Sequence, residues 1–293
     1  MARHSSSLTP LVERIESTAI LDAPGQAIAA RVRGLLGPGA LKDAVSGRWL
    51  GHALHPLLTD VVIGSWTSAS LLAVLGGDRD GAAAQRLIAV GLAAYGPTAL
   101  TGLNDWGDSE PADERVRRVG LVHATTNSVA AGLYMASLAA RRRGDHGRGK
   151  LLALAGGAVL GAGGYLGGHM SFVRGVGPNQ TAFDEGPAVW TGAGAATDLP
   201  AGEPTRVVVD ETPVLLLRQG SAVYALHDRC SHRGCSLSAQ GEVSGDIITC
   251  RCHGSQFALA DGALHRGPAT TGQPAYEVRQ SGDQIEVRLA PRE

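Results

Sequence analysis

The sequence is poor in aromatic residues and has almost no excess of charge. Aromatic residues make up 4% of the 293 residues, and the formal net charge is -1. Because no basic stretch with interleaved aromatic residues occurs, the sequence indicates no nucleic-acid partner. Residues 1–20 also lack a long apolar run, so we expect no cleaved signal peptide there.

Charged residues are almost absent from four stretches in the first two thirds of the sequence. A bilayer crossing needs about 20 mostly apolar residues in a helix, and each stretch is about long enough for one crossing. Small residues at four-residue spacing, such as Gly157 and Gly161, are typical of closely packed membrane helices. A soluble Ala-rich bundle is the alternative, but its helices would show a charged face. The four stretches are 57–77, 87–103, 119–140 and 151–173.

The last third of the sequence has a different pattern. Short runs rich in β-branched residues alternate with turn residues, which predicts a small antiparallel β domain. The predicted fold class is therefore an all-α four-helix transmembrane bundle followed by an all-β antiparallel sandwich. The expected parts are an N-terminal amphipathic or interfacial segment (1–50), a four-helix membrane domain (51–175), a linker (176–187) and the β domain (188–293).

All four cysteines lie in two short motifs of the predicted β domain. The motifs are Cys230-Ser-His232 and Cys250-Arg-Cys252-His253, and such clustering indicates one local site. This C-x-H and C-x-x-H pattern resembles the Rieske family over most of the β domain. The resemblance implies a [2Fe-2S] cluster, with Cys230 and Cys250 on one iron and His232 and His253 on the other. A zinc site built from cysteines or from a Cys/His mixture is the alternative, but the spacing fits common zinc motifs poorly.

The same resemblance implies roles for residues beside the ligands. Cys235 and Cys252 match a pair that forms a disulfide in the respiratory-complex branch of the family; two buried thiols are the alternative. Ser255 matches a serine whose hydroxyl donates to a bridging sulfide and raises the reduction potential. Phe257 stands where high-potential members have a second donor, a tyrosine, so we expect an intermediate to moderately high potential. The other matches around the cluster are Gly234, Gly254 and Pro268.

Short motifs in the apolar half resemble an uncharacterised bacterial four-helix membrane family that is sometimes fused to a Rieske domain. The motifs lie at 51–56, 101–106 and 167–169. This resemblance implies no known activity.

Three histidines of the apolar half fall near one predicted membrane face: His55, His123 and His169. Ionisable groups at membrane depth indicate functional sites. One interpretation is a haem b or another metal bound by some of these imidazoles. The other is interfacial histidines that bond to backbone carbonyls, water and Asp105.

Lysine and arginine near the predicted crossings are almost evenly divided between the two sides. The densest group, in residues 141–150, favours a cytoplasmic position for that loop. The β domain would then lie outside, where the expected disulfide would persist. We therefore expect a multi-pass protein of the cell membrane with an extracytoplasmic Rieske domain.

These features predict a membrane-anchored protein that passes single electrons between a membrane donor, a quinol or a haem, and an unknown redox partner protein. One alternative is a ferredoxin-like donor to a separate oxygenase, and another is a redox sensor. No catalytic oxygenase domain is expected, because few residues follow the last predicted strand. The sequence leaves open whether this electron carrier is a component of an oxidoreductase.

Overall fold

The computed structural model describes residues 8–76 and 80–291, which fold into two compact units. The helical unit comprises the described residues up to Leu36 together with Leu54–Val176. The β unit comprises Gly37–Ala53 together with the described residues from Gly177 onward. A short segment that precedes the long helices in the sequence is therefore part of the β unit.

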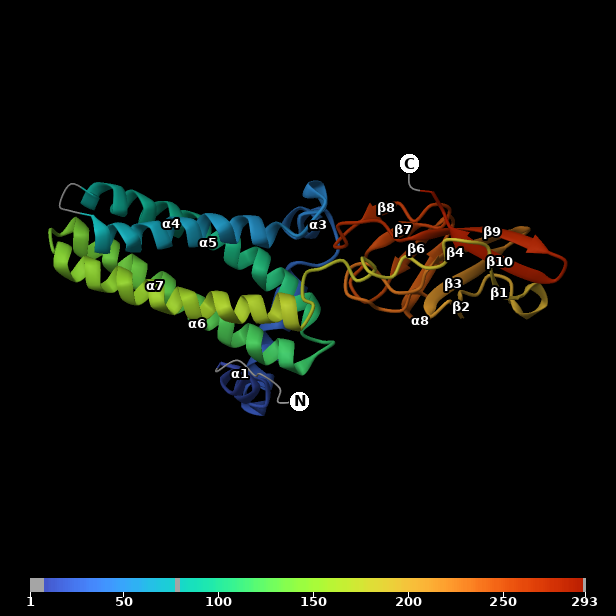
Figure 1. The fold of residues 1–293 in the computed structure, drawn as a ribbon, viewed down its shortest axis with the longest axis horizontal. Coiled ribbons are helices and arrows are strands. Elements are labelled where there is room, and N and C mark those ends of the chain that lie inside the picture. The colour runs from blue at the N-terminus through green and yellow to red at the C-terminus, as the bar shows by residue number, and fades with distance from the viewer. Residues whose placement is uncertain (1–7, 77–79, 292–293) are drawn as a thin grey trace. The chain divides into compact units, whose positions relative to one another are not determined.

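Four long helices form the body of the helical unit (Figure 1). They are α4 (Leu54–Leu75), α5 (Gly81–Ser109), α6 (Glu114–Arg142) and α7 (His146–Gly168), which continues into the π-helical turn η4 (His169–Val173). Helix α4 packs against α5 and α7, and α6 packs against the same two helices. Side-chain oxygens of Asp113 and Asp145 accept backbone N–H bonds at the start of α6 and α7, as good N-caps do.

Three of these helices are long and apolar enough to cross a membrane: α4, α5 and the continuous helix His146–Val173. The sequence predicted four apolar crossings, and the fourth stretch is the middle of α6. Helix α6 begins with Glu114 and three arginines and ends with two more, Arg141 and Arg142. The prediction of a helix there is confirmed, but α6 is more polar than its neighbours.

The bundle core contains an aromatic stack. The Trp66 ring lies 4.5 Å from that of Tyr134 and 5.8 Å from that of Tyr95, measured between centroids. The Tyr134 hydroxyl donates to the Trp66 carbonyl at 3.1 Å. Gly91 of α5 leaves room for the indole, since a Cβ there would lie 2.2 Å from Trp66 Nε1. Gly91 thus allows close packing of α4 and α5. Of the pair named from the sequence, Gly157 lies close to Ser70, whereas Gly161 has open space around it.

Short N-terminal helices pack on this bundle: α1 (Thr9–Glu16), η1 (Ala19–Leu21) and α2 (Asp22–Leu35). Val12 and Ala29 are buried against it. Asp22 Oδ2 pairs with Arg118 Nη2 at 2.6 Å. These elements are therefore tied to the bundle by both apolar and ionic contacts.

The β unit contains two antiparallel sheets. The six-stranded sheet has the order β1-β10-β9-β4-β3-β2, and the four-stranded sheet has the order β5-β6-β7-β8. The strands are β1 (Thr191–Ala195), β2 (Thr205–Val209), β3 (Thr212–Gln219), β4 (Ala222–His227), β5 (Gly241–Ser244), β6 (Ile247–Cys250), β7 (Gln256–Ala258), β8 (Leu264–Arg266), β9 (Ala275–Ser281) and β10 (Gln284–Leu289). Three short helices complete the unit: α3 (Ala40–Ser46) and η2 (Arg48–Leu50), from its early segment, and α8 (Leu237–Gln240); a single turn, η5 (Ala196–Asp198), follows β1.

Strand β3 contributes side chains to the hydrophobic clusters on both faces of its sheet. Leu215 and Leu217 join a cluster that includes Cys230 and Phe257, whereas Leu216 joins the opposite cluster with Val287. This alternation is the normal geometry of a strand buried on two sides. The predicted antiparallel β domain is thus confirmed.

Candidate metal centre

Two loops of the β unit have the same backbone geometry. The first follows β4 and begins at Cys230, whose carbonyl accepts from Gly234 N at 2.9 Å. The second follows β6 and begins at Cys250, whose carbonyl accepts from Gly254 N at 2.8 Å. Gly234 and Gly254 have φ values of +76° and +88°, a region that favours glycine. Each loop therefore needs its glycine to turn back toward its cysteine.

The loops bring the predicted thiol ligands into contact. Cys230 and Cys250 are free thiols, with 2% and 1% exposure. The Cys230 thiol donates to the Cys250 sulfur, which lowers the pKa of Cys250 to about 7. The same contact and burial raise the pKa of Cys230. A buried pair of sulfurs, one of them easily ionised, suits a metal that binds thiolates.

The loops also bring the predicted imidazole ligands together. The ring centroids of His232 and His253 lie 5.0 Å apart, at an interplanar angle of 83°. Burial, followed by the charges of neighbouring groups, holds the pKa of His232 well below its usual value. The neutral imidazole is the form that ligates a metal. Two thiols and two imidazoles are the donor set of a Rieske-type cluster, so the residues present fit that group.

A disulfide joins the two loops through Cys235 and Cys252. The sulfurs of this pair and of Cys250 all lie within 4.8 Å of one another. Among the described residues, this is the one cluster of three or more His, Cys, Asp or Glu ligand atoms. The disulfide is therefore directly beside a predicted ligand.

The other predicted neighbours of the cluster lie around the same loops. Ser255 is 1% exposed, and its Oγ accepts from Ala269 N at 2.9 Å, which leaves the hydroxyl proton for another acceptor. Pro268 lies in the segment that this bond holds and follows a cis peptide bond. Phe257 is fully buried in the core.

Sequence reasoning missed Gln273, a buried side chain that braces the first loop. Its Nε2 donates to the carbonyls of His227 and Arg229, and its Oε1 accepts from Ser231 N at 3.0 Å. All three contacts are to backbone groups far away in the sequence. No local motif marks such a residue.

Sequence reasoning also missed the early segment of the β unit. In the sequence, residues 37–53 read as the end of an interfacial segment and the start of a membrane domain. In the structure, Pro38 packs against Gly254, and Asp43 lies against Gly267. This segment touches the cluster loops, although it lies about two hundred residues before them in the sequence.

The three membrane-half histidines have separate partners. His55 Nδ1 lies 3.0 Å from the Thr98 carbonyl, and His123 Nδ1 lies 2.8 Å from the Gly163 carbonyl. His169 Nε2 lies 2.8 Å from a carboxylate oxygen of Glu16, which also binds Arg174. These contacts to carbonyls and to a carboxylate match the interfacial interpretation and add no support for a haem.

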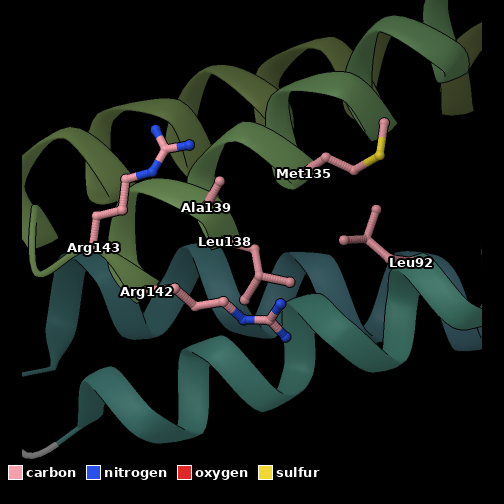
Figure 2. Close-up of a pocket in the computed structure, with 6 residues that line it drawn as sticks. All are labelled: Leu92, Met135, Leu138, Ala139, Arg142 and Arg143. Carbon is pink, nitrogen blue, oxygen red and sulfur yellow. The ribbon is translucent and has the colours of Figure 1, made fainter.

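A pocket of about 310 Å³ lies in the helical unit, between α5 and α6 (Figure 2). The apolar wall consists of Leu92, Met135, Leu138 and Ala139, and Arg142 and Arg143 border it. None of the predicted site residues lines it, so it has no part in the metal centre.

Two known families cover most of this chain. The Rieske [2Fe-2S] domain matches residues 189–277, and a predicted membrane protein family (DUF2231) matches residues 51–180. The first defines an iron–sulfur electron-transfer domain, and the second a predicted membrane domain.

Relatives support the first assignment. Ferredoxin CarAc of Metapseudomonas resinovorans is 33% identical over 100 residues, which is 34% of this chain and 92% of that protein. The anthranilate 1,2-dioxygenase ferredoxin subunit of Burkholderia cepacia is 30% identical over 102 residues, 35% of this chain and 94% of the subunit. The chain belongs to the Rieske [2Fe-2S] family.

Solved structures include similar chains. The ferredoxin of carbazole 1,9a-dioxygenase from Nocardioides aromaticivorans IC177 is 29% identical, and the match covers 34% of this chain and 97% of that one, with a TM-score of 0.32. A complex of reduced oxygenase and oxidized ferredoxin in carbazole 1,9a-dioxygenase contains a chain 30% identical, with coverage of 36% and 99% and a TM-score of 0.33.

Proposed function

We propose that this protein is a membrane-anchored carrier of single electrons, and that Cys230, His232, Cys250 and His253 hold its [2Fe-2S] cluster. The matched pair of loops is the observation that supports this most, because it joins two buried thiols and two imidazoles. When bound, such a cluster accepts and releases one electron at a time. The chain's own residues exclude water from the thiols and join the loops through Cys235–Cys252.

We propose that the electron donor is a quinol in the membrane. The β unit alone matches nearly the whole length of the ferredoxin relatives, so the helical unit is an addition to that module. Its three apolar helices would hold the cluster domain at the bilayer, where quinols dissolve. Haem is not part of this proposal, because the three candidate imidazoles have the partners described above.

A second candidate is supported by the names of the relatives. One relative is named as the ferredoxin subunit of anthranilate 1,2-dioxygenase, and one solved structure is a complex of an oxygenase with a ferredoxin. This protein would then deliver its electrons to a separate oxygenase. On this view the helices only anchor the carrier. The two candidates differ in donor: the first accepts electrons from a quinol, and the second from a reductase protein.

The test is an EPR-monitored redox titration of the purified, detergent-solubilised protein, followed by mixing with decylubiquinol. We expect a rhombic Rieske signal and its appearance on quinol addition. His253→Asn should abolish the signal, whereas the matched control His265→Asn, on an exposed strand residue, should keep it. A Rieske signal that decylubiquinol cannot produce would favour the ferredoxin role, and no signal at all would contradict both.

A further inference from the structure

The pocket between α5 and α6 has an apolar wall that ends at an arginine. On α6 it is lined by Met135, Leu138, Ala139 and Arg142, and on α5 by Leu92. Residues that are three or four positions apart lie on one face of a helix, so the four α6 residues form a single stripe. About 10 Å along the helix axis separate Met135 from Arg142. In Figure 2 the Arg142 side chain extends from α6 toward α5.

This pocket lies at the end of the bundle where a predicted membrane crossing begins. Arg143 directly follows α6, and the next helix, α7, starts at His146 and is long and apolar enough to cross a membrane. Met135 is 55% exposed, and the side chains of Arg142 and Arg143 are also exposed. The apolar stripe therefore faces the surroundings of the bundle, and its arginines lie at the depth of lipid head groups.

The two arginines of the pocket are not neutralised by the described part of the chain. Within residues 8–76 and 80–291, neither the Arg142 nor the Arg143 side chain forms a hydrogen bond or an ion pair. Residues 141–150 contain five lysines and arginines and one acidic residue, Asp145. Asp145 Oδ1 accepts from Arg148 N at 3.0 Å, because it is the N-cap of α7. Guanidinium groups bind phosphate oxygens through strong, charge-assisted hydrogen bonds.

We propose that the α5–α6 pocket binds an anionic phospholipid. One acyl chain would lie along the apolar stripe, and the phosphate would accept from Arg142 and Arg143. Basic pockets between membrane helices are suited to anionic head groups. A zwitterionic lipid carries a cation beside its phosphate, so two arginines favour a lipid with a net negative charge. The inference concerns the helical unit alone and does not depend on the metal centre.

The experiment measures the lipid concentration at which half of the full-length, detergent-purified protein carries a lipid, by native mass spectrometry. The probes are phosphatidylglycerol and phosphatidylcholine with identical acyl chains, and we expect phosphatidylglycerol to bind at the lower concentration. The double variant Arg142→Gln/Arg143→Gln should raise the value for phosphatidylglycerol roughly thirtyfold, since it removes two cations, and leave that for phosphatidylcholine unchanged. The matched control Arg148→Gln/Lys150→Gln removes two exposed cations of the same stretch from outside the pocket and should keep most of the affinity.

A second pair of variants tests the apolar part of the pocket. Ala139→Leu narrows the pocket and keeps both arginines, so it should also weaken phosphatidylglycerol binding. Ala136→Leu adds the same group at an exposed position of α6 outside the pocket and should bind like the wild type. Equal binding by these two variants would overturn the position of the acyl chain.

Three other results would overturn the inference. The first is equal affinity of the wild-type protein for the two lipids. The second is equal weakening in the two double variants, which would indicate diffuse attraction to the basic end of the bundle. The third is displacement of phosphatidylglycerol by excess inorganic phosphate, which would make a free anion the occupant.

Discussion

At the scale of single residues, the metal centre combines side chains that a motif reveals with side chains that only the fold reveals. Ser255 belongs to the first kind, because it lies two residues after the second motif. Gln273 belongs to the second kind, because its partners lie more than forty residues away. Each can be tested with a variant that differs from its control only in position.

Ser255→Ala should lower the reduction potential of the cluster. The serine is buried, and its Oγ already accepts from Ala269 N, so its proton is directed to a different acceptor. A hydrogen bond to a cluster sulfide stabilises the reduced form, and its loss should shift the couple by about tenfold, or roughly 59 mV. EPR titration measures the shift, with the exposed Ser244→Ala of β5 as the control. Equal potentials in the two variants would contradict this role.

Gln273→Leu should destabilise the first ligand loop. Leucine has a similar size, but it leaves two carbonyls and one N–H of the loop without their side-chain partner. Unmade bonds to buried groups cost about 1–3 kcal/mol each, so we expect a loss of about 3 kcal/mol or more. The temperature at which cluster absorbance is lost should fall clearly. Gln280→Leu, on the exposed part of β9, is the control and should not lower it.

At the scale of elements, local sequence patterns predicted the long helices and the two ligand loops. The apolar stretches predicted α4, α5 and α7, and the two cysteine motifs predicted the paired loops, because in each case the signal lies within a few residues. The early segment of the β unit, residues 37–53, was not predicted to pack on the cluster loops. Its contacts with Gly254 and Gly267 depend on the path of the whole chain, and its short helices carry no periodicity that distinguishes them from an interfacial segment.

The helical bundle depends on glycine where two helices approach closely. In Gly91→Ala the added methyl group would lie 2.2 Å from Trp66 Nε1, so the stacked indole or helix α5 must move. Such overpacking costs about 1–3 kcal/mol. Thermal unfolding followed by circular dichroism in detergent should show a lower midpoint for this variant. Gly96→Ala lies on the same helix with open space around it and should unfold like the wild type; equal midpoints for both would refute this packing role.

At the scale of the whole molecule, an electron-transfer module and a predicted membrane domain lie on one chain. The chain passes between the two compact units three times, because it leaves the helical unit after Leu36, returns at Leu54 and leaves again after Val176. Residues 37–53, which belong to the β unit, therefore precede the long helices in the sequence. The cluster domain is therefore not a simple C-terminal extension that could be removed intact at one point.

The side of the membrane on which the cluster domain lies is the last prediction. The connection between α6 and α7 is rich in arginine, with Arg141, Arg142, Arg143 and Arg148, and such loops stay in the cytoplasm. The disulfide Cys235–Cys252 is stable in an oxidising compartment. We therefore expect alkaline phosphatase fused after residue 291 to be active and green fluorescent protein at the same place to be dark. Insertion of the same reporters at Gly144 should give the opposite result. A bright fluorescent fusion at the C-terminal position would place the cluster in the cytoplasm and favour the ferredoxin role.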